Sequence, residues 1–219
     1  AARERHLGAL AITDHNASAN VIAVQKAAAD INVTVLAGME LQTREEVHLL
    51  CLFDSLEALE ALQAIVDKHL PNIENDAEHF GEQFVVDETG EFIRTESRLL
   101  LNSVNLTLDQ AWTYVSQLGG LAIPAHVNRR AFSLLANLGF VPPDIPFPAL
   151  EISRHILPHQ AREQFPQIQG FPLIQNGDCH YLQDFLGANM FRLQAPTITE
   201  IKYALAGEDG RSLRLRSER

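Results

Sequence analysis

The sequence lacks the features of a membrane protein or a secreted protein. None of its apolar runs approaches the roughly 20 residues that a transmembrane helix needs. Its first six residues, Ala-Ala-Arg-Glu-Arg-His, do not contain the apolar core of a signal peptide. The two cysteines, Cys51 and Cys179, are too few for the disulfide framework of a small secreted domain. We therefore expect reduced thiols and a cytoplasmic protein without a membrane partner.

The chain also lacks an excess of basic residues. It has 17 Lys and Arg against 28 Asp and Glu, which gives a formal net charge of −11. A protein that tracks a nucleic-acid backbone needs a basic face, so the charge argues against a broad nucleic-acid footprint. A small anionic substrate remains compatible with it, because bound metal ions reverse the local field.

Short apolar strands alternate with amphipathic helices along most of the chain, and this pattern is typical of the α/β class. We find no internal repeat and no low-complexity segment, and 219 residues fit one barrel-sized domain spanning 1–219. Strands are predicted at 9–13, 33–40, 47–53, 121–126, 149–153, 173–177 and 191–193, and helices at 18–30, 55–70, 108–118, 131–138, 158–165 and 197–206. Whether the strand at 47–53 is parallel or antiparallel is left open. Residues 3–7 are predicted to end a helix, and the tail from Gly207 to be frayed.

Residues 71–105 differ in amino-acid composition from the rest of the chain. They are polar and acidic, contain Gly81 and Gly90, and carry the pattern of a hairpin through 84–86 and 92–94. We interpret the segment as an insertion over the rim of the domain. It is either a lid that sets specificity or a surface excursion without a role, and the sequence leaves both open.

Several predicted strands end in the same classes of polar residue. If the strands are parallel neighbours, their carboxyl ends share one rim, as in an α/β barrel. Imidazole nitrogens and carboxylate oxygens suit Zn, Mn or Fe, and six or seven convergent groups indicate two or three metal ions. The candidates are Asp14, His15, Glu40, His48, His126, Asp178 and His180.

Each candidate also has an ordinary structural explanation. Asp14 and Asp178 could be helix N-caps, and Glu40 could be a surface carboxylate. The repetition of the same residue classes at four or five strand ends favours the metal interpretation. Arg129 and Arg154 each follow a strand end and are predicted to hold a phosphate, with surface solvation as the alternative.

Five short motifs follow one another along the chain. They are Ala-Ile-Thr-Asp-His-Asn at 11–16, Gly-Met-Glu at 38–40, Val-His-Leu-Leu at 47–50, Pro-Ala-His at 124–126 and Gly-Asp-Cys-His at 177–180. In content and order they resemble motifs of the polymerase-and-histidinol-phosphatase (PHP) superfamily, over nearly the whole chain except the insertion. The resemblance implies a distorted (β/α)7 barrel that holds three metals at its strand ends and hydrolyses phosphate esters. It implies that Glu40 bridges two metals and that Asp14 orients a ligand. The metal ligands that it implies are His15, Glu40, His48, His126, Asp178 and His180.

One motif of that family does not occur in the sequence. The family opens with a strand that ends in His-x-His, whereas this chain starts where the following helix would end. We expect the first strand to be missing from the given chain, because a barrel without it would expose two unpaired strand edges. The alternative is a protein that lacks those ligands, and with them one metal position and its activity.

These observations predict a metal-dependent phosphoesterase. Its substrate would be a small phosphomonoester or a nucleotide phosphate, attacked by a metal-activated water. The alternatives are a nuclease acting on short RNA or DNA and a non-catalytic metal-binding or regulatory domain. A metal-dependent amidohydrolase is disfavoured, because Lys26, Lys68 and Lys202 all fall in predicted helices rather than at a strand end. The residues predicted to act on the substrate are Asp14, Asp178, Arg129 and Arg154.

Overall fold

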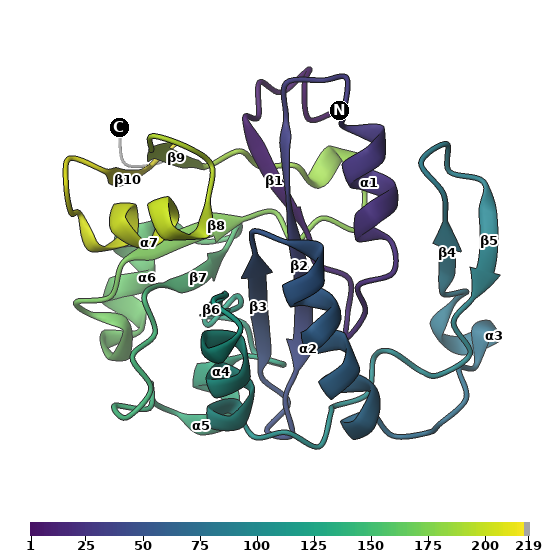
Figure 1. The fold of residues 1–219 in the computed structure, drawn as a ribbon. Coiled ribbons are helices and arrows are strands. Elements are labelled where there is room, and N and C mark those ends of the chain that lie inside the picture. Colours follow the sequence, from purple (N-terminus) through teal and green to yellow (C-terminus); the bar gives the residue numbers. More distant parts are fainter. Residues whose placement is uncertain (217–219) are drawn as a thin grey trace.

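A computed structural model describes residues 1–216 and has a mixed α/β fold (Figure 1). Its strands are β1 (Ala9–Ile12), β2 (Thr34–Gln42), β3 (His48–Phe53), β4 (Phe84–Val86), β5 (Phe92–Thr95), β6 (Leu121–Pro124), β7 (Leu150–Ser153), β8 (Leu173–Asn176), β9 (Asn189–Arg192) and β10 (Ser212–Leu215). Its α-helices are α1 (Val21–Ala27), α2 (Leu56–His69), α3 (Ala77–Phe80), α4 (Leu108–Gln117), α5 (Leu134–Leu138), α6 (Pro158–Gln164) and α7 (Ile198–Ala206). None of the described helices is both long and apolar enough to cross a membrane.

The central sheet has the strand order β1-β2-β3-β6. β1 is parallel to β2, but β3 is antiparallel to both of its neighbours, which answers the question that the sequence left open. His48 at the start of β3 pairs with Gln42 at the end of β2, and Pro124 at the end of β6 pairs with Leu49. The antiparallel strand therefore brings its first residue to the edge of the sheet where its neighbours finish.

A second, parallel pair is formed by β7 and β8, and β9 pairs with β10. Across the described part of the chain the strands form four separate sheets and do not close into a barrel. β1 pairs with β2 alone, and β8 with β7 alone, so each has an edge without a partner strand. The predicted α/β class is confirmed, and the closed (β/α)7 barrel is not seen.

The two faces of the central sheet pack against different partners. Side chains alternate between faces along a strand, so Met39 and Leu41 of β2 face the core shared with Leu59 and Leu62 of α2. Leu36 faces the opposite way, into a core shared with residues of β8 and α7. The same alternation places the side chains of Glu40 and His48 on this second face.

Two terminal predictions are wrong. Residues 2–6 form turns rather than the end of a helix. The tail from Gly207 is not frayed as far as residue 216, because it contains β10, and because Arg211 makes two hydrogen bonds of 2.9 and 2.8 Å to the carboxylate of Glu200 on α7. Residues 217–219, also within that prediction, lie outside the described residues.

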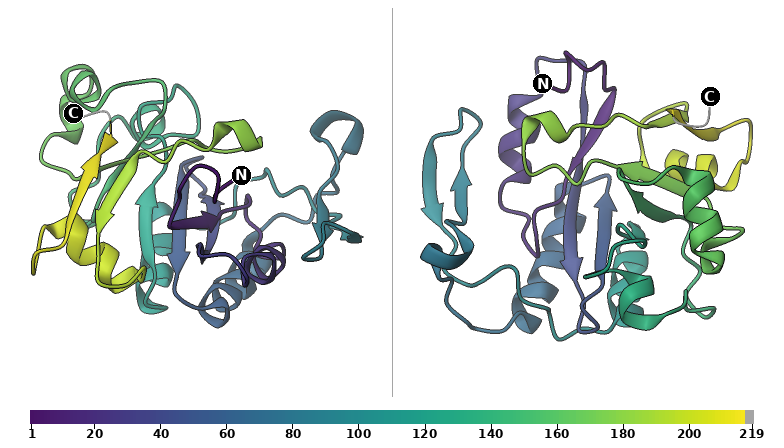
Figure 2. Two further views of the ribbon diagram at one scale, coloured as in Figure 1. Left: turned by 90° about the horizontal axis from the view of Figure 1, so that it is seen from above. Right: turned by 180° about the vertical axis from the view of Figure 1, so that it is seen from behind.

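The predicted hairpin in residues 71–105 is confirmed as β4 and β5. It follows the short helix α3 and lies apart from the other three sheets, on the side of α1 away from β2 (Figures 1 and 2). Whether it is an insertion into a single domain stays a prediction.

Candidate metal centre

Three ligand atoms from three elements converge at the edge of the central sheet. Glu40 Oε1 lies 3.0 Å from His48 Nδ1 and 3.3 Å from His126 Nε2, and these two nitrogens are 3.2 Å apart. Ligands bound to one zinc ion at about 2.0–2.1 Å in tetrahedral geometry lie roughly 3.3 Å from each other. The three atoms therefore already have the spacing that one tetrahedral cation requires.

His15 adds a fourth group on the other oxygen of the same carboxylate. It follows β1 and forms a parallel bridge with Glu40, which places its Nδ1 3.6 Å from Glu40 Oε2. This nitrogen is buried and has no hydrogen-bond partner among the described residues. Single ligand atoms of His15, Glu40 and His48 all lie within 4.8 Å of one another. A buried imidazole nitrogen without a partner beside a carboxylate fits a bound divalent cation.

The protonation states also suit metal binding. Burial alone would raise the pKa of Glu40, but hydrogen bonds with His126 and His48 hold the pKa of this carboxyl far below its usual value. Burial lowers the pKa of His15, against the attraction of Glu40. Metals bind carboxylates and neutral imidazoles, and these shifts favour both forms near neutral pH.

The ring of His48 is held in one orientation by its neighbours. Gln42 Nε2 donates to Ser103 Oγ, which leaves Gln42 Oε1 to accept a hydrogen bond of 3.1 Å from His48 Nε2. With Nε2 as the donor to Gln42, Nδ1 is the nitrogen that faces Glu40, and there a cation could take the place of the proton that hydrogen-bonds Nδ1 to the carboxylate. Phe132 stacks on the same ring, with centroids 5.1 Å apart.

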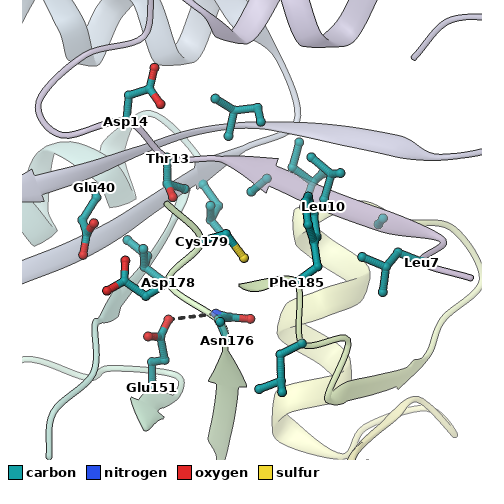
Figure 3. A pocket seen from close by; sticks show the side chains of 18 of the residues that line it. Leu7, Leu10, Thr13, Asp14, Glu40, Glu151, Asn176, Asp178, Cys179 and Phe185 are labelled. Atoms are coloured by element: carbon teal, nitrogen blue, oxygen red, sulfur yellow. Dashed lines mark hydrogen bonds between the residues drawn. The ribbon is translucent and has the colours of Figure 1, made fainter. Parts of the chain in front are cut away.

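Glu151 is a buried carboxylate beneath the cluster that the sequence interpretation left out of the site. Its Oε1 accepts the backbone N–H of His126 at 3.3 Å, and its Oε2 accepts the side-chain amide of Asn176 at 2.8 Å (Figure 3). Burial raises the pKa of Glu151 to about 7, although the hydrogen bond from Asn176 opposes the shift. Glu151 thus links the end of β6 to the end of β8. An acid between Leu150 and Ile152 in an apolar strand was the signal that could have identified it.

The Gly-Asp-Cys-His loop approaches the cluster from β8. Asp178 faces the same space as Glu40 and Glu151 (Figure 3). Asp178 Oδ2 forms an ion pair of 2.6 Å with Arg129. The ring of His180 lies 6.2 Å from that of His15, so His180 sits at the outer side of the group.

Two predicted residues do not reach the cluster directly. Figure 3 shows the Asp14 carboxylate turned away from Glu40 and Asp178. The Asp14 side chain instead accepts a hydrogen bond of 3.0 Å from Asn20 Nδ2. Arg154 forms an ion pair of 2.6 Å with Asp184. The cluster itself opens into a cavity of about 1510 Å³ that runs along β1 toward β8 and β9.

No protein-family model and no curated protein matches the chain. Among solved structures, the lesion-specific endonuclease PfuEndoQ from Pyrococcus furiosus has a TM-score of 0.58 at 20% identity, over 84% of this chain and 41% of its own. Endonuclease Q in complex with a 27-mer duplex that has an abasic lesion at the active site gives a TM-score of 0.54 at 20% identity, over 83% and 42%. A proposed metal-dependent phosphoesterase from Bifidobacterium adolescentis gives 0.56 at 18% identity, over 82% and 80%.

These neighbours show what fold the chain has. They include a proposed metal-dependent phosphoesterase and endonuclease Q, and the resemblance predicted from the five motifs is confirmed at the level of the fold. The chain spans less than half the length of the endonuclease Q chains, but most of the length of the phosphoesterase chain.

Proposed function

We propose that this chain, with its PHP-type fold, is a metal-dependent hydrolase of small phosphate monoesters, including nucleotide phosphates. The observation that carries the proposal is the convergence of Glu40, His48 and His126 at mutual distances of 3.0–3.3 Å, with His15 on the second oxygen of Glu40. We also propose that these strand ends belong to a (β/α)7 arrangement and that residues 71–105 are an insertion into it.

The donor set divides into two groups around the Glu40 carboxylate. Glu40 Oε1, His48 and His126 would hold one divalent cation, of Zn, Mn or Fe. Glu40 Oε2 and His15 would hold a second, with Asp178 and His180 on its outer side. Such ions supply a nucleophilic water at neutral pH and neutralise charge on a phosphoryl group.

The remaining residues orient and bind. Glu151 fixes the backbone of His126 and so the position of its ring. Arg129 is paired with Asp178, which lines the cavity, and its guanidinium could contact a phosphate that approaches the metal centre. Asp14 acts through Asn20 rather than at the reacting atoms. Arg154 is held by Asp184, which does not line the cavity, so the geometry supports a phosphate contact less for Arg154 than for Arg129.

A nuclease is the second candidate function, because two of the similar structures are of endonuclease Q. The net charge of −11 disfavours a long polyanionic substrate, since binding one depends on neutralising its phosphates with Lys and Arg. A small ester makes no such demand, and we therefore rank it first.

The test is phosphate release from a panel of nucleotides, sugar phosphates and short RNA and DNA, with Mn²⁺ or Zn²⁺ and with EDTA. Asp178→Asn should abolish metal-dependent release by at least a hundredfold while the circular dichroism spectrum is unchanged. Asp144→Asn is the matched control, since Asp144 is exposed and does not line the cavity. Full activity in the Asp178→Asn variant would refute the proposal. Phosphate release from RNA or DNA alone would favour the nuclease function instead.

A further inference from the structure

The hairpin of β4 and β5 is hydrogen-bonded to residues 13–20, the loop that contains His15 and precedes α1. The side-chain amide of Asn20 donates to Asp14 Oδ2 at 3.0 Å and to the carbonyl oxygen of Phe84 at 3.2 Å. The Oδ1 atom of Asn20 accepts the backbone N–H of Val86 at 3.1 Å. One side chain thus joins the hairpin to the acid that immediately precedes His15.

The end of the 71–105 segment is also hydrogen-bonded to this loop. Asn16 is fully buried, and its side-chain amide donates to the carbonyls of Leu100 and Asn102, each at 2.8 Å. Its Oδ1 accepts the backbone N–H of Gln42 at 3.0 Å. Both arms of the segment are therefore positioned relative to the metal centre by asparagines of residues 16–20.

The segment presents aromatic rings to the cavity that His15 and Glu40 also line. Phe80 and Phe84 line this cavity together with Asp14 and Asp178. The two phenylalanines are 46% and 52% exposed, although large apolar side chains are normally buried. The ring of Phe84 is supported edge-on by Phe92, with centroids 5.5 Å apart. An exposed apolar surface continuous with a polar site is the composition of a ligand-binding wall.

The charge of the segment limits what this wall can bind. Residues 71–105 contain eight Asp and Glu against two Arg and no Lys. Further phosphates next to the rings would be repelled, whereas an uncharged planar group would not. The acidic segment therefore favours a ligand with phosphate at one end only and a neutral ring at the other.

We propose that Phe80 and Phe84 form the wall that receives the planar base of a mononucleotide whose phosphate lies at the metal centre. This inference rests on the proposed function and narrows its substrates to phosphate esters that carry an aromatic base. A sugar phosphate leaves the two rings uncovered, and a polynucleotide brings additional phosphates against the acidic hairpin. The segment is then a specificity element rather than a surface excursion.

The experiment compares kcat/KM for AMP and for ribose 5-phosphate, which has the same phosphate and sugar but no base. Phe84→Ala should lower the ratio of the two values about tenfold, because removing an aromatic ring under a base costs that order of affinity. Phe84→Trp should preserve the ratio. Ile93→Ala is the matched control, since Ile93 is 58% exposed on the same hairpin and does not line the cavity, and it should leave the ratio unchanged.

An equal loss on both substrates in Phe84→Ala, or no change in the ratio, would overturn the inference. If the protein releases phosphate from neither compound, the proposed hydrolysis fails for these two esters, independently of the wall. The wall is then tested by calorimetric titration of AMP in the presence of Mn²⁺. A dissociation constant about ten times weaker in Phe84→Ala than in Ile93→Ala supports the wall. Equal constants, or no binding of AMP to either, overturn it.

Discussion

Left-handed backbone conformations mark two of the proposed ligand positions. The φ angle is +31° at His126 and +48° at Asp178, and neither residue is a glycine. Such conformations are strained for side chains with a Cβ atom and persist where surrounding contacts impose them. Glu151 supplies such a contact at His126 through the backbone N–H, and Arg129 supplies one at Asp178 through its ion pair with the side chain.

The buried carboxyl of Glu151 should make the stability of the metal-free protein depend on pH. Its pKa is raised from 4.5 to about 7 in the folded chain, so the folded state holds this proton more tightly than the unfolded state. The contribution to the free energy of unfolding is therefore present at low pH and is lost as pH rises from about 4.5 to about 7, by roughly 3 kcal/mol in total. Glu151→Gln removes this dependence.

The measurement is urea denaturation at pH 5 and pH 8 in EDTA. The decrease in stability between the two pH values should be smaller in Glu151→Gln than in the unsubstituted protein. Glu60→Gln, at an exposed position of α2, is the control and should keep the full decrease. The same decrease in both variants would show that Glu151 does not hold the proton.

At the scale of elements, the loop before α1 positions its neighbours through the side-chain hydrogen bonds of two asparagines. α1 has only seven residues and no side-chain cap, yet the loop before it contains Asn16 and Asn20. Asn16 has a φ of +50°, which asparagine tolerates better than most residues, and it connects β2 to the end of the 71–105 segment. The loop thereby fixes the relative positions of His15, β2 and the 71–105 segment.

Asn16→Ala should therefore destabilise the fold and release the segment. The change leaves the buried N–H of Gln42 and two carbonyls without partners and places alanine at a positive φ, for a loss of about 2–4 kcal/mol. Urea denaturation measures the loss, and limited proteolysis should show faster cleavage within 71–105. Asn72→Ala, at an exposed asparagine of the same segment, should cost less than about 0.5 kcal/mol. Equal stability of the two variants would contradict the anchoring role.

At the scale of the whole molecule, the candidate metal centre lies at a junction between sheets. Glu40 and His48 come from the central sheet, His126 from the loop after β6, and Glu151 and Asp178 from the β7–β8 pair and its loop. Backbone N–H groups cross the junction as well: Val127 donates to the carbonyl of Glu151 at 2.8 Å. A cation held by several of these residues would connect elements that otherwise share few strand hydrogen bonds.

Metal binding should therefore stabilise the whole fold. A cation at a hundred times its dissociation constant adds about 2.7 kcal/mol, which for a domain of this size raises Tm by roughly 5–10 °C. The measurement is the difference in Tm between Zn²⁺ or Mn²⁺ and EDTA. Glu40→Gln should lose most of this difference, whereas Glu60→Gln should keep it. An undiminished difference in Glu40→Gln would exclude the proposed centre.

The local structure, and the polar residues near the strand ends, could be predicted from the sequence alone. Apolar runs of strand length and helical stripes depend on neighbouring residues only, so β1, β2, α2, α4 and the β4–β5 hairpin were predicted close to where they lie. The motifs likewise showed His15, His48 and His126 next to strand boundaries, whereas Glu40, predicted to end its strand, lies inside β2. The structure brings these four side chains together. Their roles as ligands stay a prediction.

How those elements face one another could not be predicted from the sequence, because it depends on tertiary contacts. The antiparallel direction of β3, the pairing of β10 with β9 and the link from Glu151 to His126 depend on contacts between residues distant in sequence. The same holds for Asp14, whose orientation is set by its hydrogen bond with Asn20 and not by its motif. The alternation of residues along a strand specifies which face of the sheet a side chain occupies. Which other element packs on that face depends on contacts summed over the whole chain.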